Sequence, residues 1–255
     1  MQQSRPSRID PAVFWPAMFI ILGFVGWGTV FPESLSSISK VVLNSIIDGF
    51  GWGFVVSSAG FLIFALFLAV SRFGKIRLGQ DDERPEFRTA SWICMMFSVG
   101  MGIGLMFWGV AEPIYHFDSP PHGQAAPRSL ETALVAMKYS YFHWALHPWA
   151  IYAVVGLAIA YFTFRKGKPN LISAAFTPIL GEAASGPIGK AIDVLALIAT
   201  LFGTATSLGL GAQQINSGMN FLWGTGVSNG IALTIIGVMT VLFILSAVSG
   251  VGKGI

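Results

Sequence analysis

Long apolar runs separated by short polar stretches recur along this chain of 255 residues. A helix needs about 20 mostly apolar residues to cross the hydrocarbon layer of a membrane. Five runs reach that scale, and the last, Val194 to Gly252, is uncharged and long enough for two crossings. The pattern predicts an all-α, polytopic membrane protein, with about six helices in a single transmembrane domain over residues 1–255. The predicted helices cover approximately 14–31, 50–71, 90–111, 139–164, 193–213 and 230–250.

The composition supports a membrane location. Hydrophobic residues make up 54% of the chain and charged residues only 11%, whereas a soluble domain carries roughly 25% charged residues. Most of the surface must therefore face something other than water. The single cysteine, Cys94, lies in an apolar run, so the chain has no disulfide framework.

Basic residues gather in alternate loops and predict the orientation. Cytoplasmic loops of membrane proteins are enriched in Lys and Arg. Twelve of the fifteen basic residues fall on the side of the N-terminus, which we therefore expect to be cytoplasmic. This asymmetry explains the net charge of +3 without a nucleic-acid partner. The twelve are Arg5, Arg8, Arg72, Lys75, Arg77, Arg84, Arg88, Arg165, Lys166, Lys168, Lys190 and Lys253, and the other three are Lys40, Arg128 and Lys138.

Two connecting segments stand out from the others. Residues 112–138, which contain four prolines, are expected to form an extracellular loop. Residues 169–189 are polar with periodic apolar positions, which suits a helix lying at the cytoplasmic interface. The chain stops at Ile255, directly after the sixth predicted helix, and we expect it to be truncated there.

Glycines recur at every second position of the third predicted helix, at Gly100, Gly102 and Gly104. Gly100 and Gly104 form a G-x-x-x-G pattern, which is typical of a close helix contact. Gly102 points elsewhere and is not needed for that contact. The alternative is a broken helix, whose unwound backbone is tolerated in a membrane only where it lines a cavity. Exposed amides there could receive an anion, and exposed carbonyls a cation.

Aromatic residues gather on one face of the fourth predicted helix. Trp149 and Tyr152 lie about 60° apart around the helix axis, and Trp144 joins the same face if Pro148 bends the helix. One interpretation is an interfacial aromatic belt. The other is a cage for a quaternary ammonium, since cations bind to the faces of Trp and Tyr and no carboxylate lies within these helices.

A histidine pair offers a different chemistry. His143 and His147 are four residues apart on the same predicted helix and could both bind one metal ion. A membrane metalloenzyme is therefore an alternative, although two ligands are fewer than such a site requires. Hydrogen bonding within the helix bundle is the simpler interpretation.

The fifth predicted helix carries hydroxyl side chains one turn apart, at Thr200 and Thr204. Such hydroxyls usually donate to the backbone carbonyl four residues earlier. They could also coordinate Na⁺, a hard cation that prefers oxygen ligands. A channel that uses the glycine stretch as a carbonyl filter is a further alternative.

Three segments together resemble the betaine/carnitine/choline transporter family. They are Gly100–Pro113 (GMGIGLMFWGVAEP), Phe142–Tyr152 (FHWALHPWAIY) and Phe202–Gly211 (FGTATSLGLG). The resemblance covers essentially the whole chain. It implies a fold of twelve helices in which ten, from the third onward, form two inverted repeats of five. The chain would supply helices one to six, and so part of this secondary-transporter fold.

The resemblance also implies roles for individual residues. The residues implied to contact substrate are Trp144, Trp149 and Tyr152 in the ammonium cage, and Gly100, Met101, Gly102, Ile103 and Gly104 in an unwound stretch beside it. The residues implied to face Na⁺ are Ser98 and Met101, through backbone carbonyls, and Thr200 and Thr204. The rest of the cage and one Na⁺ ligand helix would belong to helices eight and ten, which lie outside this chain.

The implied activity is alternating-access uptake of glycine betaine, or a related quaternary-ammonium osmolyte, together with Na⁺. No cofactor is implied, and the expected partners are the small substrate, membrane lipid and, as in many family members, two further copies in a homotrimer. The expected location is the plasma membrane or bacterial inner membrane. A proton-coupled choline or carnitine carrier is the alternative within the family, but such choline carriers tend to have an acidic residue in the glycine stretch.

The basic asymmetry makes the topology testable. Single cysteines placed at Gln124, Gln80 and Lys168 would be labelled in intact cells with a membrane-impermeant thiol reagent. We expect labelling at 124 only, because 80 and 168 lie in the loops rich in Lys and Arg. The unmodified chain, with only Cys94, is the control. Labelling of position 168 from outside would overturn the predicted orientation.

Overall fold

The computed structural model describes residues 9–253, so Arg5 and Arg8 lie outside the described residues. In the described range the chain is helical and contains no strand, which confirms the all-α prediction. Within residues 9–253, five helical segments are long and apolar enough to cross a membrane, and one of them is the run Leu130–Arg165. The bent pair Thr89–Gly100 and Ile103–Asp118 raises the number to six if it is counted as one span.

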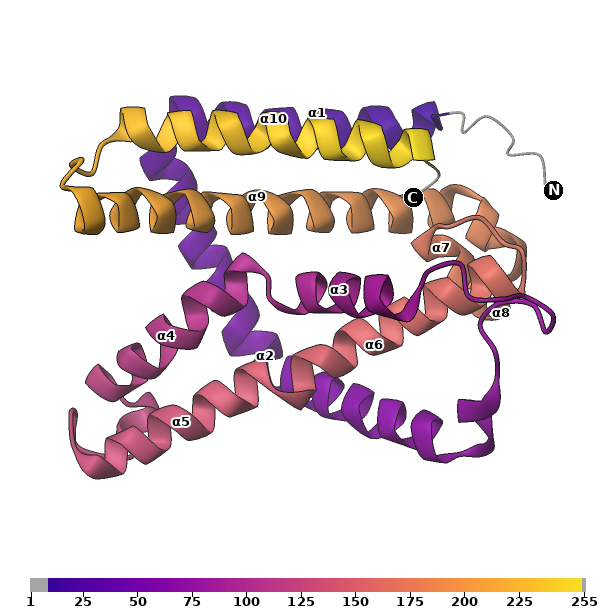
Figure 1. Ribbon diagram of the computed structural model, residues 1–255, viewed down its shortest axis with the longest axis horizontal. Coiled ribbons are helices and arrows are strands. Elements are labelled where there is room, and N and C mark those ends of the chain that lie inside the picture. The colour runs from indigo at the N-terminus through magenta and orange to yellow at the C-terminus, as the bar shows by residue number, and fades with distance from the viewer. Residues whose placement is uncertain (1–8, 254–255) are drawn as a thin grey trace. The chain divides into compact units, whose positions relative to one another are not determined.

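The helices follow one another with short connections (Figure 1). The α-helices are α1 (Pro11–Val30), α2 (Pro32–Val70), α3 (Thr89–Gly100), α4 (Ile103–Asp118), α5 (Leu130–Trp144), α6 (Leu146–Ala160), α7 (Ile172–Ala175), α8 (Thr177–Leu180), α9 (Pro187–Trp223) and α10 (Asn229–Lys253). Short 3₁₀ segments are η1 (Arg72–Lys75), η2 (Pro121–Gly123) and η4 (Gly181–Ser185), and η3 (Tyr161–Arg165) is a π-helical turn.

The chain divides into two compact units. Unit 1 consists of Met1–Pro85 and Phe142–Thr200, and unit 2 consists of Glu86–Tyr141 and Leu201–Ile255. Within unit 1, α2 packs against both α1 and α6. The boundary between the two units falls within α5 and again within α9. Each residue of these two helices is therefore assigned below to the unit that contains it.

The second helix is much longer than the predicted span 50–71. It has 39 residues and a length of about 58 Å at 1.5 Å per residue, whereas the hydrocarbon layer is about 30 Å thick. Its first half carries Glu33, Lys40 and Asp48. Hydrophobicity therefore marks only the half that suits a membrane, because helix formation itself does not require an apolar environment.

Prolines set two of the helix boundaries. Phe31, with φ −132° and ψ 63°, separates α1 from α2 because the following Pro32 disfavours a helical conformation at the residue before it. Ala145, with φ −89° and ψ −119°, separates α5 from α6. Pro148 has no N–H to donate to the carbonyl of Trp144, so the helical ladder cannot continue through this point.

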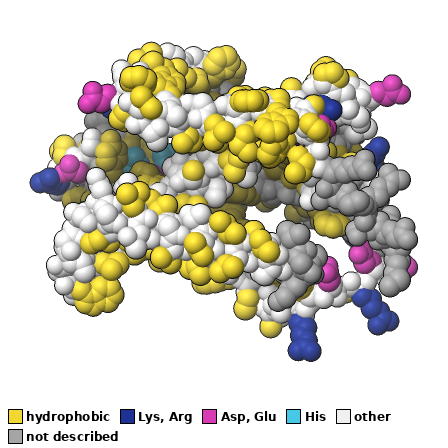
Figure 2. Space-filling view, turned by 90° about the horizontal axis from the view of Figure 1, so that it is seen from above, with side chains coloured by type: hydrophobic (Ala, Val, Ile, Leu, Met, Phe, Trp, Pro, Cys, Tyr) yellow, Lys and Arg dark blue, Asp and Glu magenta, His cyan; other side chains and the backbone are white. Residues whose placement is uncertain are grey.

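Large apolar side chains remain on the surface of the protein. Hydrophobic side chains crowd the face drawn in Figure 2, and Val70, Phe50 and Trp52 are 85%, 67% and 70% exposed. The buried apolar residues in the described part of the chain are alanines, such as Ala17, Ala136 and Ala212. Small buried residues and exposed large ones are typical of helices that pack closely together and face lipid.

The segment 169–189 forms α7, α8 and η4 rather than one interfacial helix. Asp193, in α9, holds this segment in place. Its carboxylate accepts hydrogen bonds from the Ser173 N–H at 2.9 Å and from the Ser173 hydroxyl at 2.7 Å. Because Ser173 is only 4% exposed, these two bonds satisfy donors that water reaches poorly.

The loop after η1 is attached to the end of the π-helical turn. Arg165 donates to both carboxylate oxygens of Asp81, at 2.7 and 3.3 Å, and to the carbonyl of Gly79 at 2.9 Å. The hydrogen bonds and positive charge of Arg165 hold the pKa of Asp81 below its usual value. The loop is thus attached to the π-helical turn by three hydrogen bonds from one arginine.

Removal of the Asp193 carboxylate tests how the segment 169–189 is anchored. Asp193→Asn replaces one acceptor oxygen with an NH₂ group, which cannot accept a hydrogen bond. One Ser173 donor therefore loses its partner, at a cost of about 1–3 kcal/mol. We expect faster limited proteolysis within 169–189 than in the parent protein. Asp82→Asn, at an exposed loop position, is the matched control. Equal cleavage rates for both variants would show that Asp193 does not anchor the segment.

Candidate functional site

The third predicted span, 90–111, is broken into α3 and α4 within unit 2. The two helices meet at an angle of 45° (Figure 1). Met101, with φ −94° and ψ 44°, and Gly102, with φ −68° and ψ 165°, lie between them in non-helical conformations. The break falls inside the glycine stretch. Gly100 is the last residue of α3, and Ile103 and Gly104 are the first two residues of α4.

The hydrogen-bond ladders stop on either side of this break. The N–H of Met101 donates to the carbonyl of Phe97 at 2.9 Å, which closes the ladder of α3. The next ladder begins where the N–H of Met106 donates to the carbonyl of Gly102 at 3.2 Å. The carbonyls of 98–101 and the amides of 102–105 therefore belong to neither helical ladder.

These two sets of backbone groups have opposite electrostatic character. Amides at the start of α4 form the positive end of a helix dipole, which favours an anion. Carbonyls at the end of α3 form a negative end, which favours a cation. Ser98 and Met101, the predicted carbonyl ligands of Na⁺, bound the second set. One short segment can thus offer amide donors to an anionic group and carbonyl acceptors to a cation.

Gly102 is not required by packing or by backbone strain. A methyl group built at this position would meet only the carbonyl oxygen of Val99, at 4.0 Å. Its φ of −68° is available to any residue. The open space in front of Gly102 therefore lets another molecule approach the backbone closely, which is a recognised use of glycine at a binding site.

The predicted aromatic face is partly assembled within unit 1. The rings of Trp149 and Tyr152, both on α6, have centroids 5.6 Å apart and planes tilted by 37°. They are 42% and 69% exposed, so their faces are available to a ligand. Trp144 lies before the Ala145 break, as the last residue of α5. The chain is interrupted at Ala145, three residues before Pro148, so Trp144 lies in a different helix from Trp149 and Tyr152.

The break at Ala145 separates the two histidines of the metal hypothesis. His143 is in α5 and His147 is in α6, so they are not one turn apart on a continuous helix. The ring of Phe142 packs against His147, with centroids 4.6 Å apart. The helical spacing that motivated a metal site therefore does not hold in the structure.

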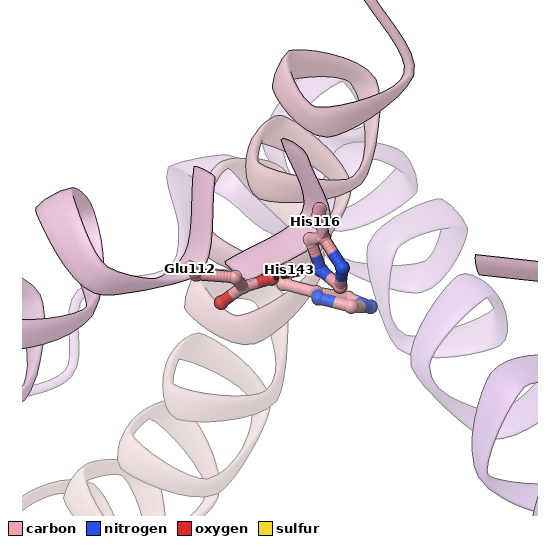
Figure 3. A group of neighbouring side chains, drawn as sticks. All are labelled: Glu112, His116 and His143. Carbon is pink, nitrogen blue, oxygen red and sulfur yellow. Dashed lines mark hydrogen bonds and ion pairs between the residues drawn. The ribbon is translucent and has the colours of Figure 1, made fainter. Parts of the chain in front are cut away.

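A buried acid–histidine pair lies on α4, where an extracellular loop was expected. That expectation for 112–138 is wrong at both ends, because α4 continues to Asp118 and α5 begins at Leu130. Glu112 Oε1 and His116 Nε2 are 3.2 Å apart, and these side chains are only 10% and 12% exposed (Figure 3). The four-residue spacing in the sequence could have indicated this pair. Figure 3 also shows His143, from the last turn of α5, which belongs to unit 1.

The pair on α4 is enclosed by its neighbours in unit 2. The His116 ring lies 5.6 Å from the ring of Tyr139 on α5. The hydroxyl of Tyr139 accepts a hydrogen bond from Gln124 at 3.2 Å. A ring contact and a hydrogen bond thus connect α4, the following loop and α5 beside a carboxylate that was expected to lie outside the helices.

The hydroxyls of α9 show the backbone bonding that is usual in membranes. Thr200 Oγ1 donates to the carbonyl of Ala196 at 2.8 Å, and Thr206 Oγ1 donates to that of Phe202 at 2.9 Å. Such a bond uses the hydroxyl proton, and the oxygen keeps lone pairs that could accept a cation. Thr204 lies one turn further along α9 than Thr200.

The chain is similar in sequence to members of one family of known proteins. Residues 12–255 match the family model of the BCCT, or betaine/carnitine/choline family, transporters. The chain is 51% identical to the glycine betaine transporter OpuD of Bacillus subtilis over 246 residues, which are 96% of this chain and 48% of that protein. It is 48% identical to a probable glycine betaine transporter of Desulfitobacterium hafniense over 94% of this chain and 48% of that protein.

A third relative is named for two substrates. The betaine/ectoine transporter LcoP of Corynebacterium glutamicum is 42% identical over 99% of this chain and 40% of that protein. The chain thus spans less than half the length of each of these three relatives. The similarity covers the broken helix, the aromatic face and the hydroxyl-bearing helix together.

Proposed function

This chain belongs to the betaine/carnitine/choline family of transporters, and from that membership we propose that it serves Na⁺-coupled uptake of glycine betaine or a related quaternary-ammonium osmolyte. Family membership makes it a transporter rather than an enzyme. Alternating access around the broken helix, a location in the plasma or bacterial inner membrane, an N-terminus in the cytoplasm and assembly as a homotrimer belong to the same proposal.

The break between α3 and α4 is the observation that carries the proposal. Glycine betaine has a carboxylate and a quaternary ammonium, so its site must offer hydrogen-bond donors to one end and an apolar, electron-rich surface to the other. The amides of 102–105 lie outside the helical ladders and would donate to the carboxylate. The glycine at 102 leaves room for that approach.

The aromatic face suits the other end of the substrate. A quaternary ammonium has no N–H, so a carboxylate cannot form a hydrogen bond with it, whereas an aromatic face attracts its spread positive charge. Trp149 and Tyr152 present two neighbouring faces of this kind on α6. We include Trp144 as the third aromatic residue of the cage.

Oxygen ligands support Na⁺ as the coupling ion. Backbone carbonyls at Ser98 and Met101 would serve one ion, and the hydroxyls of Thr200 and Thr204 another. Proton coupling, as in choline carriers of this family, is the second candidate. The buried pair of Glu112 and His116 favours it, because both groups can exchange a proton.

Truncation of the aromatic face tests the substrate assignment in the full-length protein. We expect Trp149→Ala to weaken betaine binding by roughly 0.5–2 kcal/mol, because one cation–π contact is lost. Tyr152→Phe should retain part of the affinity, since the ring face survives. Trp52→Ala, at an exposed position on α2, is the control. Binding isotherms in detergent would measure the effect, and parental affinity in Trp149→Ala would show that the cage is misplaced.

Removal of two hydroxyls tests the coupling ion. Thr200→Ala with Thr204→Ala should raise the Na⁺ concentration for half-maximal uptake, with less effect on betaine affinity at saturating Na⁺. Thr206→Ala removes a hydroxyl with the same backbone bond and is the matched control. Uptake that is unchanged when K⁺ replaces Na⁺, but that varies with a proton gradient, would instead support the Glu112–His116 alternative.

A further inference from the structure

The first residue of α4 packs against a glycine of α9 within unit 2. A Cβ atom built on Gly211 would lie 2.5 Å from Ile103 Cδ1, 3.2 Å from Ile103 Cγ2 and 3.4 Å from Ile103 Cγ1. Three atoms of one isoleucine side chain therefore surround the place where any other residue would have its side chain. Gly211 is buried, so this close approach lies inside the unit rather than on its surface.

Three other glycines of α9 within unit 2 do not make such a contact. Methyl groups built at Gly203, Gly209 and Gly218 would meet nothing within 4 Å. The requirement for glycine on α9 is therefore specific to position 211 among these four. It depends on the location of Ile103 and not on the flexibility of α9.

The side chain of Ile103 must move to admit a methyl group at position 211. Its Cδ1 atom, at 2.5 Å, would have to turn about the outer bond, and Cγ2, at 3.2 Å, would have to give by a few tenths of an ångström. A β-branched residue in a helix has one strongly preferred χ1 rotamer. A methyl group at position 211 would therefore turn the outer bond of Ile103 away from its present rotamer and push the side chain, and with it the first turn of α4, away from α9. The core is close-packed, so such a displacement reaches the neighbouring residues.

The backbone of Ile103 belongs to the candidate site. It is the first residue of α4, and its amide is among the four, at 102–105, that lie outside the helical ladders. A shift of Ile103 therefore moves the group of amides proposed to receive the substrate carboxylate. The side chain of Ile103, by contrast, is used in packing against α9.

We propose that Gly211 is a positioning residue for substrate binding: the absence of a side chain there lets Ile103 seat against α9 and fixes the amides at the start of α4. The role rests on the proposed function of those amides. Ile103 then has two roles: its amide faces the substrate, and its side chain anchors α4 against α9. Neither residue type nor spacing in the sequence distinguishes Gly211 from Gly209.

Size changes at positions 211 and 103 test this role in the full-length protein. We expect Gly211→Ala to raise the KM for betaine by about fivefold to tenfold, as an overpacked contact displaces the amides, with a smaller effect on kcat. Gly209→Ala gains the same helix propensity without any contact and should keep the parental KM. Adding Ile103→Val to Gly211→Ala removes the closest atom and should restore much of the affinity.

Two results would overturn the proposal. One is an equal KM for Gly211→Ala and Gly209→Ala at equal surface expression. The other is a raised KM in Gly211→Ala that Ile103→Val does not lower, because the effect would then not pass through this contact. General misfolding would reduce the amount of active carrier and not produce a KM change that a smaller residue at 103 reverses.

Cross-linking separates this inference from the proposed function. In a background with Cys94→Ser, Ile103→Cys paired with Gly211→Cys should form a cross-link on oxidation, whereas Ile103→Cys paired with Gly209→Cys should not. If the parent protein shows no saturable betaine uptake, the proposed function fails, and the cross-link still decides whether the contact exists. If uptake is present and the first pair does not cross-link, the positioning role fails alone.

Discussion

A polar backbone group inside a membrane needs a partner, and this constraint governs the most informative part of the chain. Each unsatisfied N–H or carbonyl costs several kcal/mol in hydrocarbon, so a helix is interrupted there only where protein, water or a ligand supplies the missing bonds. The break between α3 and α4 takes the carbonyls of 98–101 and the amides of 102–105 out of their ladders. A substrate that carries both charges can satisfy groups of both kinds.

A side-chain contact within unit 2 stabilises this interruption. Ile103, the first residue of α4, packs against Gly211 of α9. The contact fixes the start of α4, although the amides of its first turn have no helical partner. Within unit 1, the break at Ala145 has a local cause in Pro148 and gives α6 its own start just before Trp149 and Tyr152. Each unit thus contains one interrupted helix with candidate site residues beside the break.

Periodicity and composition predicted the features that depend on local sequence. The apolar runs located the membrane helices, and the spacing of Gly100, Gly102 and Gly104 indicated the break. The length of α2 was missed because hydrophobicity reports the environment of a helix and not its ends. The burial of Glu112 and the contact of Gly211 could not be predicted, because both depend on neighbours far away in the sequence.

Hydrogen–deuterium exchange at the break tests the central claim most directly. The amides of 102–105 would be followed in the full-length protein in Na⁺, with and without glycine betaine. If these amides bind the substrate carboxylate, betaine slows their exchange, while the amides in the middle of α10, which already have helical partners, remain unchanged. Saturable betaine binding that leaves exchange at 102–105 unaltered would contradict the account.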